Sequence, residues 1–197
     1  MSLGQMLRIP HGVLGQVFVC VLFAIAAGVS RPWIEHGGWT GRASERARRL
    51  GCWCLLLLLA QLWVAAAMRH NYAGLAIPTF PFSTPEGALL PAAWDYRVAL
   101  QFAHRVLAVV LAVAVATYGH CLWRDPALPV WLRTSSIGLV GLIALQILLG
   151  AQIIWSGRQA YVTTGHVLVG ALTLAAVFVV TLFVHRDSIE EPPSSAA

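Results

Sequence analysis

Five apolar runs, each long enough to cross a bilayer, constrain the fold of this chain more than any other feature. A membrane-spanning helix needs about 20 mostly apolar residues at a rise of ~1.5 Å per residue. The chain has 197 residues, of which 58% are hydrophobic and only 11% charged. A soluble domain of this size needs more polar surface. The sequence therefore predicts an all-α integral membrane protein with five transmembrane helices, at roughly 11–30, 51–69, 96–122, 134–156 and 161–184.

The first run follows only ten residues, which carry a single arginine, Arg8. A signal peptide is therefore the alternative interpretation of this run. No small-residue cleavage site followed by a soluble domain accompanies it, as a signal peptide would require. We expect residues 1–30 to carry the first transmembrane helix.

Polar and proline-rich segments separate the runs and define the expected organisation. Prolines and glycines crowd the longest of these segments, which excludes a regular helix there. The C-terminal end is short, polar and proline-containing, a composition typical of disorder. We expect a polar connector at 31–50, a four-helix bundle at 51–184 that includes an outer loop at 70–95, and a disordered tail at 185–197.

Arginine supplies every basic side chain, and its placement predicts the topology. Arginines concentrate in the connector, and others lie between the third and fourth runs and in the tail. The positive-inside rule puts such segments in the cytoplasm. We expect a multi-pass protein of the cell inner (cytoplasmic) membrane, with the N-terminus and loop 70–95 outside and the C-terminus cytoplasmic. The net charge of +5 follows from this topology. No basic–aromatic stripe indicates nucleic-acid binding, so the expected partner is the lipid bilayer.

Two histidines inside apolar runs are the clearest sign of a functional site. His104 and His166 each lie one to two turns from the outer end of a helix, so we expect them at similar depth. An intramembrane polar residue is costly and usually faces the bundle interior. Each histidine also belongs to a stripe of polar and small residues at helical spacing. The stripes are Arg97, Gln101, His104 and Ala108, and Gln159, Thr163, His166, Gly170 and Thr173.

Three roles remain open for this histidine pair. Two neutral imidazoles on facing helices give a haem iron its two axial ligands, and the small residues one turn inward leave room for a flat macrocycle. Alternatively, each histidine bonds a helix carbonyl, or the pair relays protons. Structural zinc fits less well, because it takes four ligands and the outer half offers no cysteine and few acids. The four cysteines lie toward the cytoplasmic side without zinc or redox spacing.

Arginines near the outer edge are candidate partners for haem propionates, since arginine binds carboxylates by charge-assisted, often bidentate hydrogen bonds. These candidates are Arg105, Arg97, Arg69 and Arg158. For Arg105 the alternative is snorkelling to lipid headgroups. His70 touches a propionate or is simply interfacial. The cytoplasmic-side histidines are expected to be solvated or interfacial; they are His36, His120 and His185.

A short repeat links the first and last runs. The first run begins "HGVLG" at His11, and the last contains "HVLVG" at His166, so both carry His-x-x-x-Gly near the outer face. Such an echo is expected of a duplicated helical unit with one histidine per equivalent helix.

Three longer motifs make the chain resemble the heme A synthase family, membrane proteins of cytochrome oxidase assembly. They are "RHNYAGLAIPTFP" from Arg69, "FAHRVLA" from Phe102 and "TTGHVLVGALTLA" from Thr163, in that order. Members of the family have eight transmembrane helices in two pseudo-symmetric halves, each with histidines on its second and fourth helices. The family oxidises the C8 methyl group of heme O to the formyl group of heme A.

The resemblance covers residues 51–184 as the C-terminal half of this pattern. It implies that His104 and His166 are the axial ligands of a haem b cofactor and therefore bind its iron. The first helix then matches the last helix of the N-terminal half. His11 would be a ligand of a second haem, heme O or A as substrate or product.

The resemblance also implies that the first three helices of the pattern are absent, together with an acidic outer loop tied to catalysis. We therefore expect a truncated product, a split subunit or a fragmentary gene model, and we name no catalytic base. A second polypeptide would supply the absent helices, and heme O synthase is an expected assembly partner. The alternatives are a bis-histidine b-type cytochrome that only transfers electrons, and a non-catalytic assembly subunit or relic.

Overall fold

The five apolar runs form five long helices in the computed structural model, which describes residues 3–35 and 43–190. Every regular element in those ranges is a helix, and all five long helices are long and apolar enough to cross a membrane. The all-α, five-helix prediction is confirmed. The helices are α1 (Leu3–Gly28), α2 (Arg31–Ile34), α3 (Glu45–His70), α4 (Tyr96–Arg124), α5 (Val130–Trp155), α6 (Ala160–Val184) and α7 (Arg186–Glu190).

The connector is shorter than the sequence predicts, because α3 begins at Glu45 rather than near residue 51. The Ser44 side chain caps this helix by accepting a hydrogen bond from the Ala47 backbone N–H at 3.4 Å. Glu45 in the first turn interacts favourably with the helix dipole. The short helix α2 occupies the start of the expected connector. His36 lies outside the described residues.

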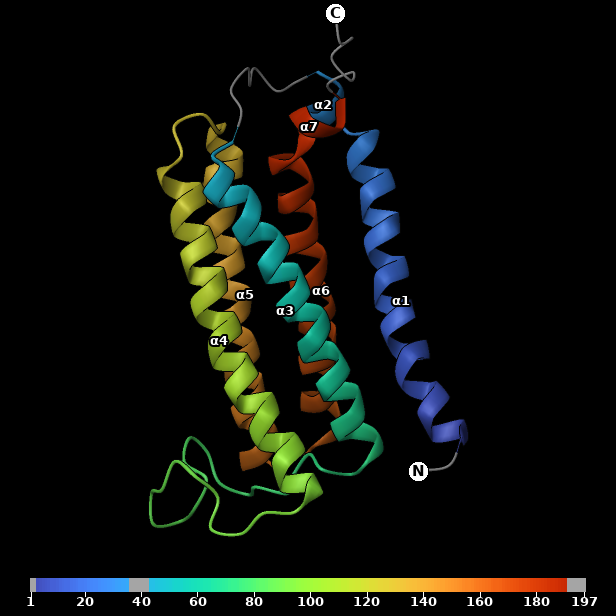
Figure 1. The fold of residues 1–197 in the computed structure, drawn as a ribbon, viewed down its shortest axis with the longest axis vertical. Coiled ribbons are helices and arrows are strands. Elements are labelled where there is room, and N and C mark those ends of the chain that lie inside the picture. Colours follow the sequence, from blue (N-terminus) through green and yellow to red (C-terminus); the bar gives the residue numbers. More distant parts are fainter. Residues whose placement is uncertain (1–2, 36–42, 191–197) are drawn as a thin grey trace, which may run out of the picture.

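Helices α3 to α6 form a four-helix bundle in which each helix packs against the next and α6 packs back on α3. Consequently α4 and α6 lie diagonally opposite each other (Figure 1). Helix α1 packs outside this ring, against α3 and α6. The buried core includes Leu111 and Val115 of α4, Leu139 of α5 and Val177 of α6.

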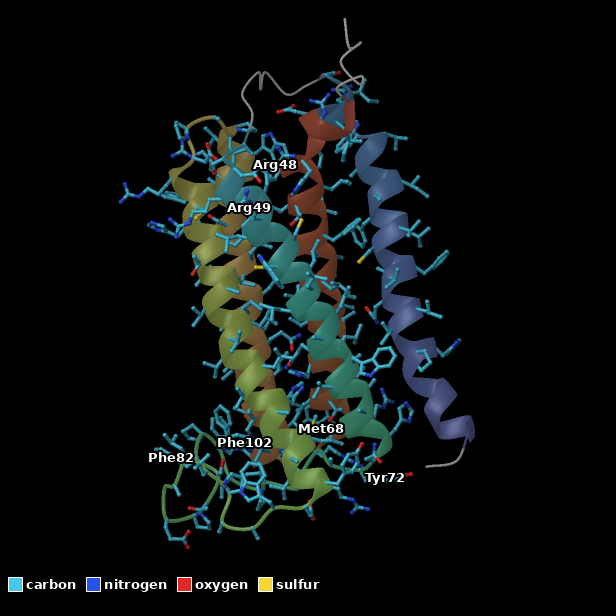
Figure 2. All side chains as sticks on the ribbon, viewed as in Figure 1. Arg48, Arg49, Met68, Tyr72, Phe82 and Phe102 are labelled. Atoms are coloured by element: carbon cyan, nitrogen blue, oxygen red, sulfur yellow. The ribbon has the colours of Figure 1, made fainter. Side chains whose placement is uncertain are left out.

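The two ends of the bundle differ in composition (Figures 1 and 2). The loop end carries the start of α1, residues 71–95 and the turn 156–159. The arginine end carries α2, the start of α3, the turn 125–129 and α7; Figure 2 shows Arg48 and Arg49 there. Asp125 closes this end by accepting a hydrogen bond from the Ser44 backbone N–H at 2.8 Å.

The predicted disordered tail is wrong for residues 186–190, which form α7. Arg186 is only 2% exposed, and its guanidinium lies over the Trp33 ring, 5.5 Å from the centroid. Trp33 also packs edge-on against Phe183 of α6. The cation–π contact and this aromatic packing hold the start of the tail against α2. Residues 191–197 lie outside the described part of the chain.

Candidate functional site

His104 and His166 lie on the diagonal helices α4 and α6, about two turns from the ends of those helices at the loop end. The Nδ1 atom of each ring is buried and has no hydrogen-bond partner. Because native proteins satisfy nearly all buried polar atoms, such a pair calls for an explanation. These two nitrogens are the clearest sign of a ligand site among the described residues.

Two glutamines on the intervening helices contact the histidine residues. Gln61 of α3 donates from Nε2 to the His104 carbonyl oxygen at 3.1 Å and lies 3.3 Å from the His104 Nε2 atom. Gln146 of α5 donates from Nε2 to the His166 carbonyl oxygen at 2.8 Å. Sequence reasoning missed both glutamines, although a lone amide in a run of leucines and alanines is itself a signal of a buried polar contact.

Small residues surround the histidine on α6. A Cβ atom at Gly150 would lie 3.5 Å from the His166 Cε1 atom, and one at Gly170 would lie 3.3 Å from the Gln146 Nε2 atom. Glycine at these positions lets the imidazole and the amide pack close to helix backbone. The predicted small stripe next to His166 is therefore part of this packing.

Two side chains of α4, Gln101 and Arg105, tie the long loop onto the bundle. Gln101 is 3% exposed; its Oε1 accepts from the Ile77 N–H at 2.6 Å, and its Nε2 donates to the Gly74 carbonyl at 3.1 Å. Arg105 donates to the carbonyls of Ile77, at 3.1 Å, and Thr79, at 2.6 Å. These bonds fix the loop beside the helical turn that carries His104.

Arg105 thus has partners that sequence reasoning did not foresee. Its guanidinium also donates to the Phe82 carbonyl at 3.3 Å and lies 5.7 Å from the centroid of the Phe80 ring. The Arg105 Nε atom is buried without a hydrogen-bond partner. Figure 2 shows Phe82 and Phe102 at this end of the molecule. The backbone carbonyls of an irregular, proline-rich loop, rather than lipid headgroups, are the partners of this guanidinium here.

The other predicted residues lie at or near the loop end but outside the bundle interior. Arg69, Arg97 and Arg158 are exposed, and Arg158 has a left-handed backbone with φ 68°. His70 is half-buried in the last turn of α3. His11 is exposed on α1, and a Cβ atom at the following Gly12 or Gly15 would meet nothing within 4 Å. The face of α1 that carries His11 is therefore open in the described part of the chain, unlike the matching face of α6.

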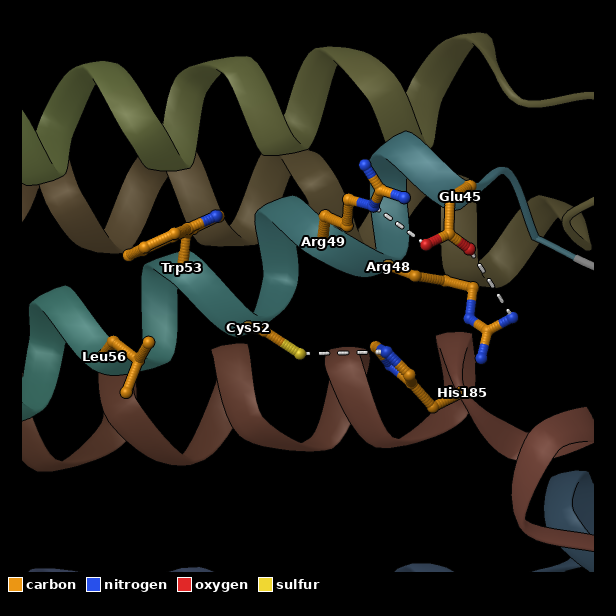
Figure 3. A pocket seen from close by; sticks show the side chains of 7 residues that line it. All are labelled: Glu45, Arg48, Arg49, Cys52, Trp53, Leu56 and His185. Carbon is orange, nitrogen blue, oxygen red and sulfur yellow. Dashed lines mark hydrogen bonds and ion pairs between the residues drawn. The ribbon is translucent and has the colours of Figure 1, made fainter.

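Cys52 and His185 form a second polar pair at the arginine end (Figure 3). The Cys52 Sγ atom lies 3.8 Å from the His185 Nε2 atom, and the His185 Nδ1 atom lies 2.9 Å from the Thr181 carbonyl oxygen. Because a carbonyl only accepts, Nδ1 carries the proton and Nε2 accepts from the thiol. The pair borders an open pocket of about 330 Å³, lined by Glu45, Arg48, Arg49, Cys52, Trp53, Leu56 and His185.

This pocket is at the opposite end of the bundle from His104 and His166, so it belongs to a different site. Glu45 forms ion pairs with Arg49 at 2.9 Å and with Arg48 at 3.9 Å. His185 was expected to be solvated or interfacial, and it is instead half-buried with two contacts. His120 is exposed, as expected.

The two histidines near the loop end suit a pair of ligands to one iron rather than a cluster of ligands around a metal ion. Among the described residues, no group of three or more His, Cys, Asp or Glu side chains lies together. Two imidazoles on diagonal helices, with a glycine beside one of them, fit the ligand set of a haem iron.

Comparison with known proteins identifies the family of this chain. The model of the COX15-CtaA family, described as cytochrome oxidase assembly protein, matches residues 4–178. The chain belongs to this family. The matched range of this COX15-CtaA protein includes His11, His104 and His166, together with both glutamines.

Several curated relatives of this COX15-CtaA family member are named heme A synthase. The heme A synthase of Listeria welshimeri is 27% identical over 126 residues, covering 64% of this chain and 40% of the relative. The heme A synthase of Anaplasma marginale is 31% identical over 132 residues, covering 61% of this chain and 35% of the relative. The matched region thus spans well under half the length of either relative.

Proposed function

We propose that this chain is the haem b-binding part of a heme A synthase-type protein, with His104 and His166 as the axial ligands. The observation that carries the proposal is the pair of histidines on the diagonal helices α4 and α6, each with a buried ring nitrogen that no protein group satisfies. The names of the curated relatives support the assignment to heme A biosynthesis and cytochrome oxidase assembly. The substrate of the complete activity would be heme O, whose methyl group is oxidised to a formyl group.

A haem bound by two imidazoles would supply one-electron transfer. The residues of this chain bind and orient that group. His104 and His166 would hold the iron, and Gly150 and Gly170 keep the helix surfaces near His166 shallow.

The exposed arginines of the loop end would neutralise the haem propionates; they are Arg69, Arg97 and Arg158. Arg105 would also contact a propionate, through its unpartnered Nε atom, while its terminal nitrogens donate to the carbonyls of the loop. Gln101 and Arg105 together keep the loop over this edge and so limit the access of water.

The loop end would face outward from the inner membrane, and the arginine end would face the cytoplasm. The support is the arginine distribution, since α2, the start of α3 and α7 all carry arginines at one end. A cysteine placed at Ser83 in an otherwise cysteine-free chain should react with an impermeant maleimide from the outside. Labelling of this cysteine only after membrane permeabilisation would reverse the orientation.

His11 is proposed to face a second haem, the substrate or product, once further helices cover α1. The support is the open, small-residue face that follows His11. Those helices would come from a second polypeptide or another part of a longer chain. Adding them should raise the haem content measured by pyridine haemochrome from one to two per chain and make His11→Ala costly. Two haems in this chain alone, with one lost in His11→Ala, would contradict this part of the proposal.

The second candidate function is electron transfer alone, as in a b-type cytochrome, or a non-catalytic role in oxidase assembly. Ligation of haem iron by both histidines would favour this candidate, since it would leave the iron no position for oxygen. Detection of heme A or hydroxylated heme O, made by the chain with the completing helices, would decide for the synthase.

The experiment that tests haem ligation is a spectrum of the purified, reduced protein. We expect a low-spin b-type spectrum that is lost or becomes high-spin in His104→Ala and in His166→Ala. His120→Ala is the matched control, since His120 is exposed on α4. An unchanged low-spin spectrum in His104→Ala would refute the assignment.

A further inference from the structure

We propose that Gln61 and Gln146 are a matched pair of positioning residues that fix the two histidines of the bundle. This inference rests on the proposed function, in which His104 and His166 ligate haem. Both glutamines would act through the histidines and not on the haem itself.

The two glutamines occupy equivalent places in two helical hairpins. Gln61 lies nine residues before the last residue of α3, and Gln146 lies nine residues before the last residue of α5. Each donates a hydrogen bond to the backbone carbonyl of the histidine on the next helix. Each is also followed four residues later by a small residue, Ala65 or Gly150. The hairpins α3–α4 and α5–α6 therefore repeat one contact between helices.

This contact is suited to fixing the position of one helix along its axis relative to the next helix. A helical carbonyl oxygen has a second lone pair, so the amide adds a bond without breaking the helix. An amide in an apolar span is costly unless it is bonded, which favours the bonded arrangement over alternatives. Because the carbonyl belongs to the histidine residue itself, the bond fixes the backbone from which the imidazole projects.

Gln61 makes a further contact that Gln146 does not. Its Nε2 atom is 3.1 Å from the His104 carbonyl oxygen and 3.3 Å from the His104 Nε2 atom. The carbonyl requires a donor, so the amide nitrogen and not the amide oxygen lies there. An NH2 group only donates, so in the haem-free protein the His104 Nε2 atom accepts this bond with the lone pair that the iron would take. Gln61 thus holds the backbone of His104 and, in the haem-free protein, its ring as well.

The Gln146 side chain is constrained by the backbone of α6. A Cβ atom at Gly170 would come within 3.3 Å of its Nε2 atom, so the amide packs against α6 one turn beyond His166. The small residue of the stripe therefore leaves room for the amide of this glutamine.

The test compares Gln61→Met, Gln146→Met and the double variant, because methionine keeps the length of glutamine without its donor. Gln152→Met is the matched control, since Gln152 is exposed on α5. Haem loss to excess apomyoglobin should be about three- to tenfold faster in each single variant, from the loss of one interhelical hydrogen bond. The double variant should show the product of the two effects. The ferric low-spin EPR signal should shift as well, because it reports the orientation of the imidazole planes.

A second measurement on the haem-free protein separates this inference from the proposed function. In ¹⁵N-histidine NMR spectra, Gln61→Met should shift the His104 Nε2 resonance, whereas Gln146→Met and Gln152→Met should leave it in place. Haem-loss rates and EPR signals equal to wild type in both single variants would overturn the positioning role while leaving haem binding intact. If the wild-type protein binds no haem, the proposed function fails, and the NMR comparison alone decides whether Gln61 fixes the ring.

Discussion

Replacing Gln101 with leucine should release the first part of the long loop from α4 while leaving the bundle folded. Leucine has a similar volume and prefers a helix, so the α4 backbone has no reason to change. The Ile77 N–H, which now donates to the Gln101 Oε1 atom at 2.6 Å, would lose its acceptor. Ile77 is only 2% exposed, so water does not replace that acceptor without opening the loop.

The magnitude follows from the individual bonds. An unsatisfied buried donor such as the Ile77 N–H costs about 1–3 kcal/mol. The bond to the Gly74 carbonyl, at 3.1 Å, adds about 0.5–1.5 kcal/mol. A third contact, to the Ile77 carbonyl at 3.4 Å, is near the geometric limit and adds little. Loop attachment should therefore weaken by about 2–4 kcal/mol.

Hydrogen–deuterium exchange in detergent micelles or nanodiscs measures this loss directly. A local opening that is easier by about 2–4 kcal/mol accelerates exchange of the Ile77 amide by about 30-fold or more. Ala103→Leu is the control, because Ala103 is exposed on the same helix. Arg105 still holds the carbonyls of Ile77 and Thr79 in Gln101→Leu, so Gln101→Leu/Arg105→Met should speed exchange further and extend it to the rest of the loop.

The result that refutes the reasoning is an Ile77 amide that exchanges at the wild-type rate in a Gln101→Leu protein of unchanged helix content. Such an outcome means that the polar contacts of Gln101 contribute nothing to loop attachment. Faster exchange throughout α3 to α6 would place the effect in the bundle and would equally contradict it.

Two further predictions concern the arginine end. Gly51→Ala should lower the free energy of unfolding by about 1–3 kcal/mol, because its Cβ atom would lie 2.7 Å from the Thr181 Oγ1 atom. In the double variant, Thr181→Ala should recover most of that loss, as measured by thermal unfolding in detergent. Cys52 should react with maleimide much faster than Cys54, which is 0% exposed, and mass spectrometry measures both rates. His185→Ala should slow the reaction of Cys52, since His185 accepts from its thiol. Equal rates for the two thiols would contradict the packing of α3.

The fold was largely readable from the sequence, because membrane-spanning helices are encoded by local composition. Apolar runs about one bilayer long became helices, and the prolines of loop 70–95 kept that segment irregular. The stripes at His104 and His166 rightly predicted that both face the bundle interior, although ligation of haem stays a prediction. Helix ends were less readable, since capping by Ser44 extended α3 by one and a half turns or more beyond the predicted start.

The contacts around the site were less readable because they depend on which helices become neighbours. Gln61 and Gln146 stand alone among apolar residues and belong to no stripe on their own helices. Their partners are carbonyls on the next helix, and any helix offers carbonyls, so no residue type marks the pairing. The loop contacts of Arg105 were unforeseen for the same reason, since its partners are backbone atoms of a loop whose path is not periodic.

One helical turn of α4 combines the tasks that the rest of the bundle separates. Gln101 and Arg105 hold the loop, while His104 between them meets Gln61 from α3. A helix is rigid over a single turn, because each N–H bonds the carbonyl four residues earlier. A shift of this turn therefore moves the loop anchors and the imidazole together. The attachment of the loop and the position of His104 are therefore coupled. The hydrogen bonds to the loop and the contact with Gln61 stabilise the same position of α4. His166 has only the Gln146 contact among these restraints, which makes α4 the more firmly held side of the proposed haem site.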